Sequence, residues 1–365
     1  MTLAPAASNL PEWLVRLPKA ELHVHLEGSV TPERLASWLR RDGGASRCPP
    51  SAADLRRAFR RIRDMPSFVA SYVEIMRAFD RPSRFAEAVA DLAARFGAFG
   101  FVRLEVTVTA AAYVALWRID PRGLVEGLLE GRLRARALGV DVAFVPDVVR
   151  TLPETVEPTL AFADALRHAD EGALAAVGLA GPEPRRPPPR VEETCRLLVR
   201  RRPSEVPVVP HAGEFGTAEG VRWAIEALGA PRIGHGIAVL EDPATVALAR
   251  ARGTVFEVCP DSNLRLGAAG GGRHPLRSML RAGLGVVLAT DDPGIFELSP
   301  LASYAFALDR GVPAHEIVAM AERSLRASLG RWDRDAALRT LTQLGRRILL
   351  GRTPTVRPCS PVPWR

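Results

Sequence analysis

Eight short apolar runs, separated by longer stretches of helical character, recur along most of this 365-residue chain. Runs rich in Val, Ile and Leu and bounded by polar residues, Gly or Pro are typical of strands buried in a parallel sheet. The runs lie near Glu21–His25, Phe101–Thr109, Val140–Val149, Leu174–Gly181, Val206–His211, Arg232–Val239, Thr254–Pro260 and Gly285–Thr290. Eight β/α units in succession favour an α/β fold, a closed (β/α)8 barrel of the TIM type, over an open doubly wound sheet.

The link between the first two runs is too long for a simple crossover, so we predict a helical insertion over residues 31–98. A stripe of large apolar residues recurs within it at helical spacing. The stripe consists of Met65, Phe68, Tyr72, Met76 and Phe79. It is typical of a helix face packed on a core. Part of the insertion could also roof a pocket, because β-to-α connections lie on the catalytic face of a barrel.

The predicted barrel forms one domain over residues 17–352. The two ends of the chain, 1–16 and 353–365, are rich in proline, and we expect them to be flexible. Pro184–Arg190 is predicted to be a stiff, extended loop.

A formal net charge of +8 raises the question of nucleic-acid binding. The basic residues are nearly all arginines, and Lys19 is the only lysine. They are dispersed along the chain without interleaved aromatic residues, which is typical of a solvated surface. We therefore expect no nucleic-acid partner.

No apolar run reaches the roughly 18 residues that a membrane span needs. The first residues also lack the basic start and apolar stretch of a signal peptide. The four cysteines are scattered, with no C-x-x-C pair, so neither a disulfide framework nor a cysteine zinc site is indicated. These features predict a cytoplasmic protein without a membrane partner. They leave the oligomeric state open.

Four of the seven histidines stand at the C-terminal ends of predicted strands. These ends converge on one mouth in a β/α barrel, so residues distant in sequence become neighbours there. The histidines are His23, His25, His211 and His235, and the last strand is followed by Asp291 and Asp292. Residues two apart on a strand point to the same face, as the H-V-H pair does. Each residue alone is commonly structural, but their joint placement indicates a shared site.

Zinc prefers nitrogen and oxygen donors of this kind, and a catalytic zinc site keeps a position for water. Three of the histidines and one aspartate could supply four ligands and leave a fifth position for that water. Bound zinc lowers the pKa of its water toward neutrality, and an acid or base is then needed within reach. Glu214 and His235 are the candidates for this work. We predict one Zn²⁺ per chain.

The motifs HVHLEG, HAGE, GHG, CPDSN and TDDP occur in this order over residues 17–307 and resemble those of the adenosine deaminase family of zinc aminohydrolases. The resemblance implies four zinc ligands, which are His23, His25, His211 and Asp291. It also implies that Glu214 protonates the purine at N1 and that His235 orients the attacking water and accepts its proton. Asp292 would hold the ring at N7, and the backbone of Gly181 would contact N3. A carboxyl group can protonate the ring only if burial raises its pKa.

Some residues depart from the usual pattern of the family. Adenosine deaminases usually carry aspartate where this chain has Glu27, and the resemblance implies that this acid contacts the ribose. HLEG and LEVTVT are closer to the adenine deaminase and aminodeoxyfutalosine deaminase branches, and the loop VGLAGPE is shorter than usual. We therefore expect a reshaped or absent sugar site.

Together these features predict an aminohydrolase that removes the 6-amino group of an adenine-containing small molecule and releases ammonia. Two alternatives stay open: a zinc hydrolase of the same superfamily that cleaves a non-purine amide, ester or amidine, and a barrel retained only for binding. The other zinc deaminase design needs H-x-E and P-C-x-x-C, and CPDSN lacks the second cysteine. We expect Cys259 to be a buried strand residue and Asn263 to shape its loop.

Overall fold

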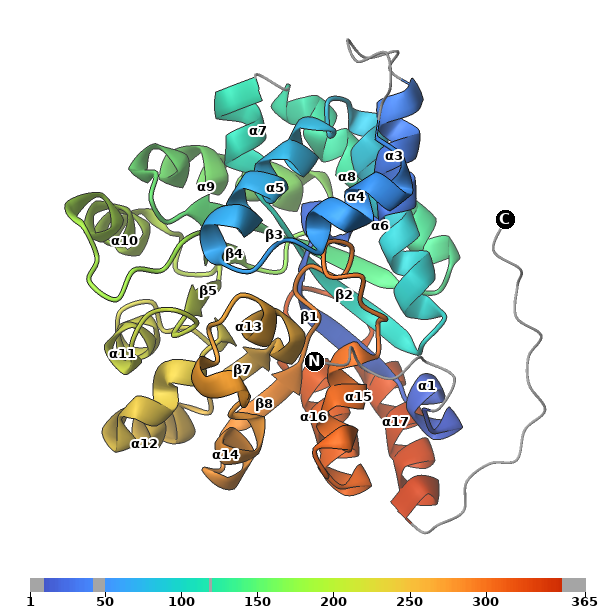
Figure 1. Ribbon diagram of the computed structural model, residues 1–365, viewed down its shortest axis with the longest axis vertical. Helices are drawn as coiled ribbons and strands as arrows, with labels where there is room; N and C mark the ends of the chain where they lie inside the picture. Colours follow the sequence, from blue (N-terminus) through green and yellow to red (C-terminus); the bar gives the residue numbers. More distant parts are fainter. Residues whose placement is uncertain (1–9, 42–49, 118–119, 350–365) are drawn as a thin grey trace.

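The computed structural model describes residues 10–41, 50–117 and 120–349 of the chain (Figure 1). The C-terminal segment 353–365, predicted to be flexible, lies outside these residues. Residues 1–9 of the N-terminal segment 1–16 lie outside them too. The rest of that segment contains helix α1 (Glu12–Arg16), whose Leu14 is fully buried.

Eight parallel strands form one sheet in which each strand pairs with the next in sequence. They are β1 (Lys19–His25), β2 (Phe101–Val108), β3 (Asp141–Val149), β4 (Val177–Ala180), β5 (Val208–Ala212), β6 (Arg232–His235), β7 (Val255–Val258) and β8 (Gly285–Leu288). A parallel bridge between Val24 and Asp291 joins the two ends of this sheet at the mouth. The predicted barrel is therefore confirmed.

The strands lie where the sequence predicts them, and their ends differ by a few residues. The largest difference is in β6, which was predicted to reach Val239 and ends at His235. Gly236 has a φ of +67° and turns the chain into the 3-10 helix Ile237–Glu241. The apolar run therefore continues past the strand because the turn after it is also buried.

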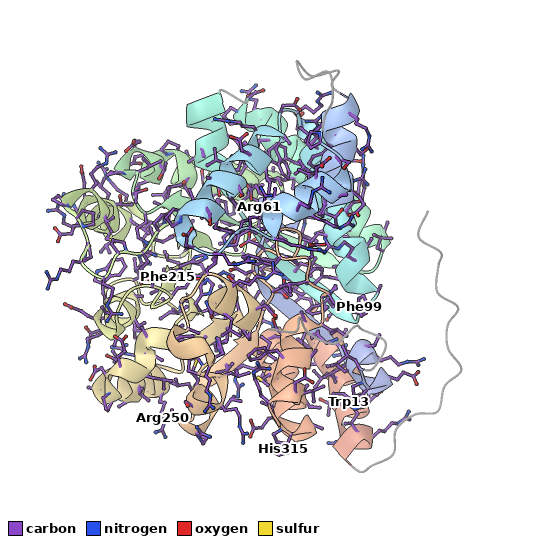
Figure 2. The ribbon with its side chains drawn as sticks, in the orientation of Figure 1. Trp13, Arg61, Phe99, Phe215, Arg250 and His315 are labelled. Atoms are coloured by element: carbon purple, nitrogen blue, oxygen red, sulfur yellow. The ribbon has the colours of Figure 1, made fainter. Side chains whose placement is uncertain are left out.

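Helices surround the barrel, and side chains fill the space between them and the strands (Figures 1 and 2). The helices that follow β2 to β8 are α7 (Ala110–Trp117), α8 (Pro121–Ala137), α9 (Val156–Ala169), α10 (Pro189–Arg201), α11 (Ala218–Glu226), α12 (Pro243–Arg252), α13 (Pro260–Arg265), α14 (Leu276–Arg281), α15 (Ala302–Asp309), α16 (Ala314–Ala327) and α17 (Arg334–Leu349). The segment predicted as an extended loop is non-helical up to Pro188, and α10 begins at Pro189. None of the described helices combines the length and the apolar character that crossing a membrane requires.

The predicted helical insertion between the first two strands is confirmed. It contains α2 (Leu26–Ser29), α3 (Pro32–Arg41), α4 (Ala52–Phe59), α5 (Met65–Arg77) and α6 (Pro82–Gly97). In Figure 1, α3, α4 and α5 are blue and lie in the upper part, and α6 is cyan and runs down the right side. Ser51 and Asp64 cap α4 and α5 through reciprocal hydrogen bonds to the first turn.

The apolar stripe of the insertion has both of its predicted roles. Met65, Phe68, Tyr72 and Met76 line a cavity at the barrel mouth. Phe79 is fully buried and packs against aromatic rings of the core. The helix α5 therefore joins the core to the roof of the cavity.

Candidate active site

Four side chains with metal-binding atoms meet at the C-terminal ends of β1, β5 and β8. One donor atom from each of His23, His25, His211 and Asp291 lies within 4.8 Å of the others. Nε2 of His23 and Nε2 of His25 lie 3.3 and 3.4 Å from Oδ1 of Asp291. Nε2 of His25 and Nε2 of His211 are 3.2 Å apart. The fold therefore brings together the set that the sequence predicted as a His/His/His/Asp metal site.

Backbone pairing between β1 and the segment after β8 fixes the place of Asp291. The amide of Asp291 donates to the carbonyl of His23 over 3.0 Å, and the amide of His25 donates to the carbonyl of Asp291 over 2.9 Å. Asp291 has a φ of 66°, which is uncommon for a residue with a side chain. The two hydrogen bonds hold this strained backbone, as is common at functional sites.

The cluster fits a divalent cation with nitrogen and oxygen ligands. Nε2 of His23 is buried and makes no hydrogen bond to any described residue. Burial alone would lower the pKa of His23, but the nearby carboxylates of Asp291 and Glu257 raise it to about 10. Burial alone would also lower the pKa of His25, but the charges of Asp292 and Asp291 raise it to about 9. Burial, followed by the charge of His23, lowers the pKa of His211 well below its usual value, so positive charge is favoured at two of the three imidazoles. Three imidazoles and a carboxylate are donors of the kind that zinc prefers.

The buried carboxylate of Glu257 orients the imidazole of His23 from the side away from the cavity. Oε2 of Glu257, on β7, lies 2.8 Å from Nδ1 of His23. Its other oxygen accepts from Arg232. Gly234 leaves room for this arrangement, because a Cβ there would lie 2.6 Å from Cε1 of His23. The acceptor that a zinc-bound imidazole needs, which the sequence could not assign, is Glu257 for this ligand.

Glu214 and His235, the predicted acid and base, lie beside the metal-binding side chains, and both contact the side-chain amide of Asn263. Burial, followed by the charges of Asp291 and Glu183, raises the pKa of Glu214 well above its usual range. Burial lowers the pKa of His235 to about 3, so its imidazole is neutral at neutral pH. Nδ2 of Asn263 lies 3.3 Å from Oε1 of Glu214 and 2.9 Å from Nδ1 of His235. Asn263, expected only to shape its loop, therefore links the two groups.

Asp292 is almost fully buried and lines the cavity. Its Oδ1 has no hydrogen-bond partner among the described residues. Burial and the charge of Asp291 raise the pKa of this carboxyl well above its usual range. A Cβ at Gly28 would collide with it, so the glycine of HLEG makes space for Asp292.

The cavity above the cluster has a volume of about 340 Å³. Side chains of α5 form one wall, and His25, Glu214 and Asp291 lie on another. The ring of Phe68 stacks on Phe296, from the segment after β8, with centroids 5.8 Å apart. The insertion thus rests on the segment that carries the two aspartates.

Two further predicted substrate contacts differ in their exposure to the cavity. Gly181, at the end of β4 with a φ of +93°, lines it. Glu27 is fully buried behind the wall. Its Oε2 accepts from the hydroxyl of Tyr72 over 2.9 Å, and its Oε1 accepts from the amide of Thr109 over 3.2 Å.

Asp147, which the sequence analysis did not single out, also lines the cavity. It lies near the C-terminal end of β3, and its Oδ1 is buried without a partner in the part of the chain that is described. Burial raises its pKa to about 6. The signal that could have found it is an acid near the end of an otherwise apolar strand.

Comparison with known proteins agrees with this geometry. The family model described as adenosine deaminase matches residues 18–343. The chain belongs to the adenosine deaminase family. It is therefore a deaminase of the group of hydrolases that cleave C–N bonds.

Two curated relatives of this family member are deaminases of different substrates. An aminodeoxyfutalosine deaminase from Acidothermus cellulolyticus is 35% identical over 312 residues, which cover 83% of this chain and 85% of the relative. An adenine deaminase from Rhodospirillum rubrum is 31% identical, over 90% of this chain and 96% of the relative.

Solved structures share the fold of this family member. The adenine deaminase of Arthrobacter aurescens has a TM-score of 0.78 at 26% identity and covers 90% of this chain and 98% of its own. An amidohydrolase from Burkhoderia ambifaria with bound Zn has a TM-score of 0.78 at 21% identity. The match covers 95% of this chain and 98% of the amidohydrolase.

Proposed function

We propose that this deaminase removes the 6-amino group of an adenine-type small molecule without a phosphate group, with one zinc ion held by His23, His25, His211 and Asp291. The observation that carries the proposal is a buried carboxyl group, Glu214, that lines the same cavity as these metal-binding side chains. Zinc, when bound, supplies the Lewis acidity that makes water nucleophilic at neutral pH.

The residues around the cavity divide the proton transfers between them. The raised pKa of Glu214 favours the protonated form of its carboxyl, which can donate to N1 of the ring. Protonation lets N1 accept the electron pair that is displaced when water attacks the carbon that bears the amino group. Neutral His235 orients the water, takes its proton and passes it to the amino group, which leaves as ammonia. The second proton of the water replaces the one that Glu214 gives to N1. Asp292 holds N7 with its unpartnered carboxyl, and the backbone of Gly181 contacts N3.

The composition of the cavity supports a substrate without a phosphate group. Its described lining consists mainly of apolar side chains, with histidines, threonines and carboxyl groups, and contains no described arginine or lysine. A phosphate would therefore meet carboxylates without a counter-charge from this lining. Because Glu27 is tied to Tyr72 and Thr109, we propose that it shapes the wall instead of contacting a sugar.

The test is ammonia release from adenine, adenosine, deoxyadenosine, aminodeoxyfutalosine and AMP by the zinc-loaded protein. We expect turnover of at least one of the four compounds without phosphate and much slower turnover of AMP. Glu214→Gln should lower kcat by about 10²- to 10⁴-fold with its metal content unchanged. Glu192→Gln, an exposed carboxylate of α10, is the matched control.

No ammonia from any 6-aminopurine, at one zinc per chain, would overturn the proposal. Partial retention of some other hydrolytic activity in Glu214→Gln would favour a non-purine substrate, because proton donation to N1 has no meaning there.

A further inference from the structure

The loop that carries Glu214 is held by a second carboxylate from the neighbouring β/α connection. Oε1 of Glu183 accepts from the amide of Gly213 over 2.7 Å. Its Oε2 accepts from the amides of Glu214, Phe215 and Gly216 over 2.9, 3.2 and 3.1 Å. One carboxylate therefore binds four consecutive backbone N–H groups.

We propose that Glu183 is a positioning residue that fixes the backbone of Glu214 and so directs its carboxyl group at the purine ring. The inference rests on the proposed function, because the role of Glu214 belongs to that function. Successive N–H groups in a turn form a concave anion site, which is usually filled by a ligand. Here the chain fills the site with its own side chain.

The local sequence on both sides is built for this contact. Gly213 has a φ of +72°, which turns the chain out of β5 and points the following amides to one side. A Cβ at Gly216 would collide with the carboxylate of Glu183. Pro182 and Pro184 restrict the backbone on either side of Glu183.

The two loops are neighbours because β4 and β5 pair in parallel. The β4 connection therefore reaches the cavity at Gly181 and the acid-bearing loop at Glu183, two residues later. A single short segment thus sets the distance between the ring edge and the proton donor. Figure 2 labels Phe215, which follows Glu214 in the loop that Glu183 holds.

Hydrogen bonds to an ionised acceptor are roughly twice as strong as neutral ones. Replacing the carboxylate of Glu183 by an amide removes that charge and turns one oxygen acceptor into a donor that faces N–H groups. The loop should then loosen, and Glu214 should lose its alignment. A misplacement of about 1 Å near a reacting group can cost about 10²-fold in rate.

The first experiment measures kcat, KM and metal content of Glu183→Gln. We expect kcat to fall by about 10- to 100-fold, KM to stay within about threefold, and metal content to be unchanged. Glu192 is exposed and lines the same surface cavity as Glu183, so the control Glu192→Gln should match the wild type. A kcat within threefold of wild type, or a loss that only follows lost metal, would overturn the proposal.

The second experiment places Glu183→Gln in the Glu214→Gln background. If Glu183 acts through Glu214, the double variant should turn over within about threefold of Glu214→Gln alone, because coupled residues are not additive. If the loss of kcat in the double variant instead equals the product of the two single losses, the inference is wrong. Isotopically labelled adenine-type substrate makes the slow turnover of these variants measurable.

Amide hydrogen exchange separates this proposal from the proposed function. A peptide covering residues 208–217 should exchange at least about tenfold faster in Glu183→Gln than in wild type or Glu192→Gln. This result is expected even if no 6-aminopurine is a substrate, in which case only the proposed function fails. Unchanged exchange in this peptide shows that Glu183 does not hold the loop.

Discussion

Charged side chains are buried at two levels of this barrel, and His23, His211 and Asp292 at the mouth differ from Arg232 below them in how their polar atoms are satisfied. At the mouth, Nε2 of His23, Nδ1 of His211 and Oδ1 of Asp292 have no hydrogen-bond partner among the described residues. Toward the opposite end, the guanidinium of Arg232 donates to Glu257, to Glu105 and to the carbonyl of Ala327.

We interpret the difference as one of role: the polar groups at the mouth are available to a ligand, and the charge of Arg232 stabilises the fold. A buried structural charge is stable only when protein partners surround it. A buried polar atom without a hydrogen-bond partner needs an explanation, and beside the metal-binding side chains a bound ion or substrate supplies one. Glu257 belongs to both levels, because one oxygen meets His23 and the other meets Arg232.

The largest effect is expected from removing a group at the mouth. His211→Ala should lower bound zinc from about one per chain to a small fraction and reduce kcat by about 10⁴-fold or more, because a metal ligand is lost. Metal analysis and ammonia release measure both. Since the imidazole is close to the cavity, the unfolding midpoint of the metal-free protein should change little. If the metal-free variant unfolds much more easily than the metal-free wild type, His211 also stabilises the fold, and the mouth does not differ from the lower level in this respect.

The next effect concerns the lower level. Arg232→Met should reduce the free energy of unfolding by about 3–5 kcal/mol, because the buried carboxylates of Glu105 and Glu257 both lose the guanidinium that they share. Denaturant unfolding of the metal-free protein measures it. Arg250→Met, at an exposed site on α12 labelled in Figure 2, should stay within about 0.5 kcal/mol of wild type. Equal stability of the two variants would show that the lower charges are not structural.

The junction of the two levels should respond in metal affinity. Glu257→Gln should weaken zinc binding by about 10- to 100-fold, because it removes the charge that orients and polarises His23. Competition with a chelator of known affinity gives the value. The exposed Glu226→Gln supplies the matched control. If both variants bind zinc as the wild type does, the two levels are independent.

The smallest effect depends on pH and concerns Lys19. Its ammonium is fully buried, donates to the carbonyl of Phe99 over 2.6 Å and lies 4.9 Å from the ring centre of Phe101. Burial lowers its pKa from 10.5 to about 7. Above pH 7 the unfolded chain therefore holds more protons than the folded chain, and the free energy of unfolding should rise by up to about 1.4 kcal/mol per pH unit.

Lys19→Met should lose this part of the pH dependence between pH 7 and 9. Because Lys19 is the only lysine, a lysine-specific isotope label gives a single side-chain resonance whose titration reports its pKa. A midpoint near 10.5 in the folded protein would contradict the prediction.

The sequence by itself determined the barrel and the members of the metal cluster. Strand residues alternate between faces, so His23 and His25 had to point the same way, and parallel β/α units had to bring His211 and Asp291 to the same mouth. It could not fix strand ends, as the early end of β6 at His235 shows, because buried turns are as apolar as strands.

Only the tertiary structure decided which side chains support that cluster. Glu257 beneath His23, Asn263 between the acid and the base, and Asp147 in the cavity wall depend on strand register and side-chain depth. The burial of Glu27 behind Tyr72 depends on where the insertion folds back. These contacts join residues from 28 to 234 positions apart, where local sequence patterns carry no information about distance.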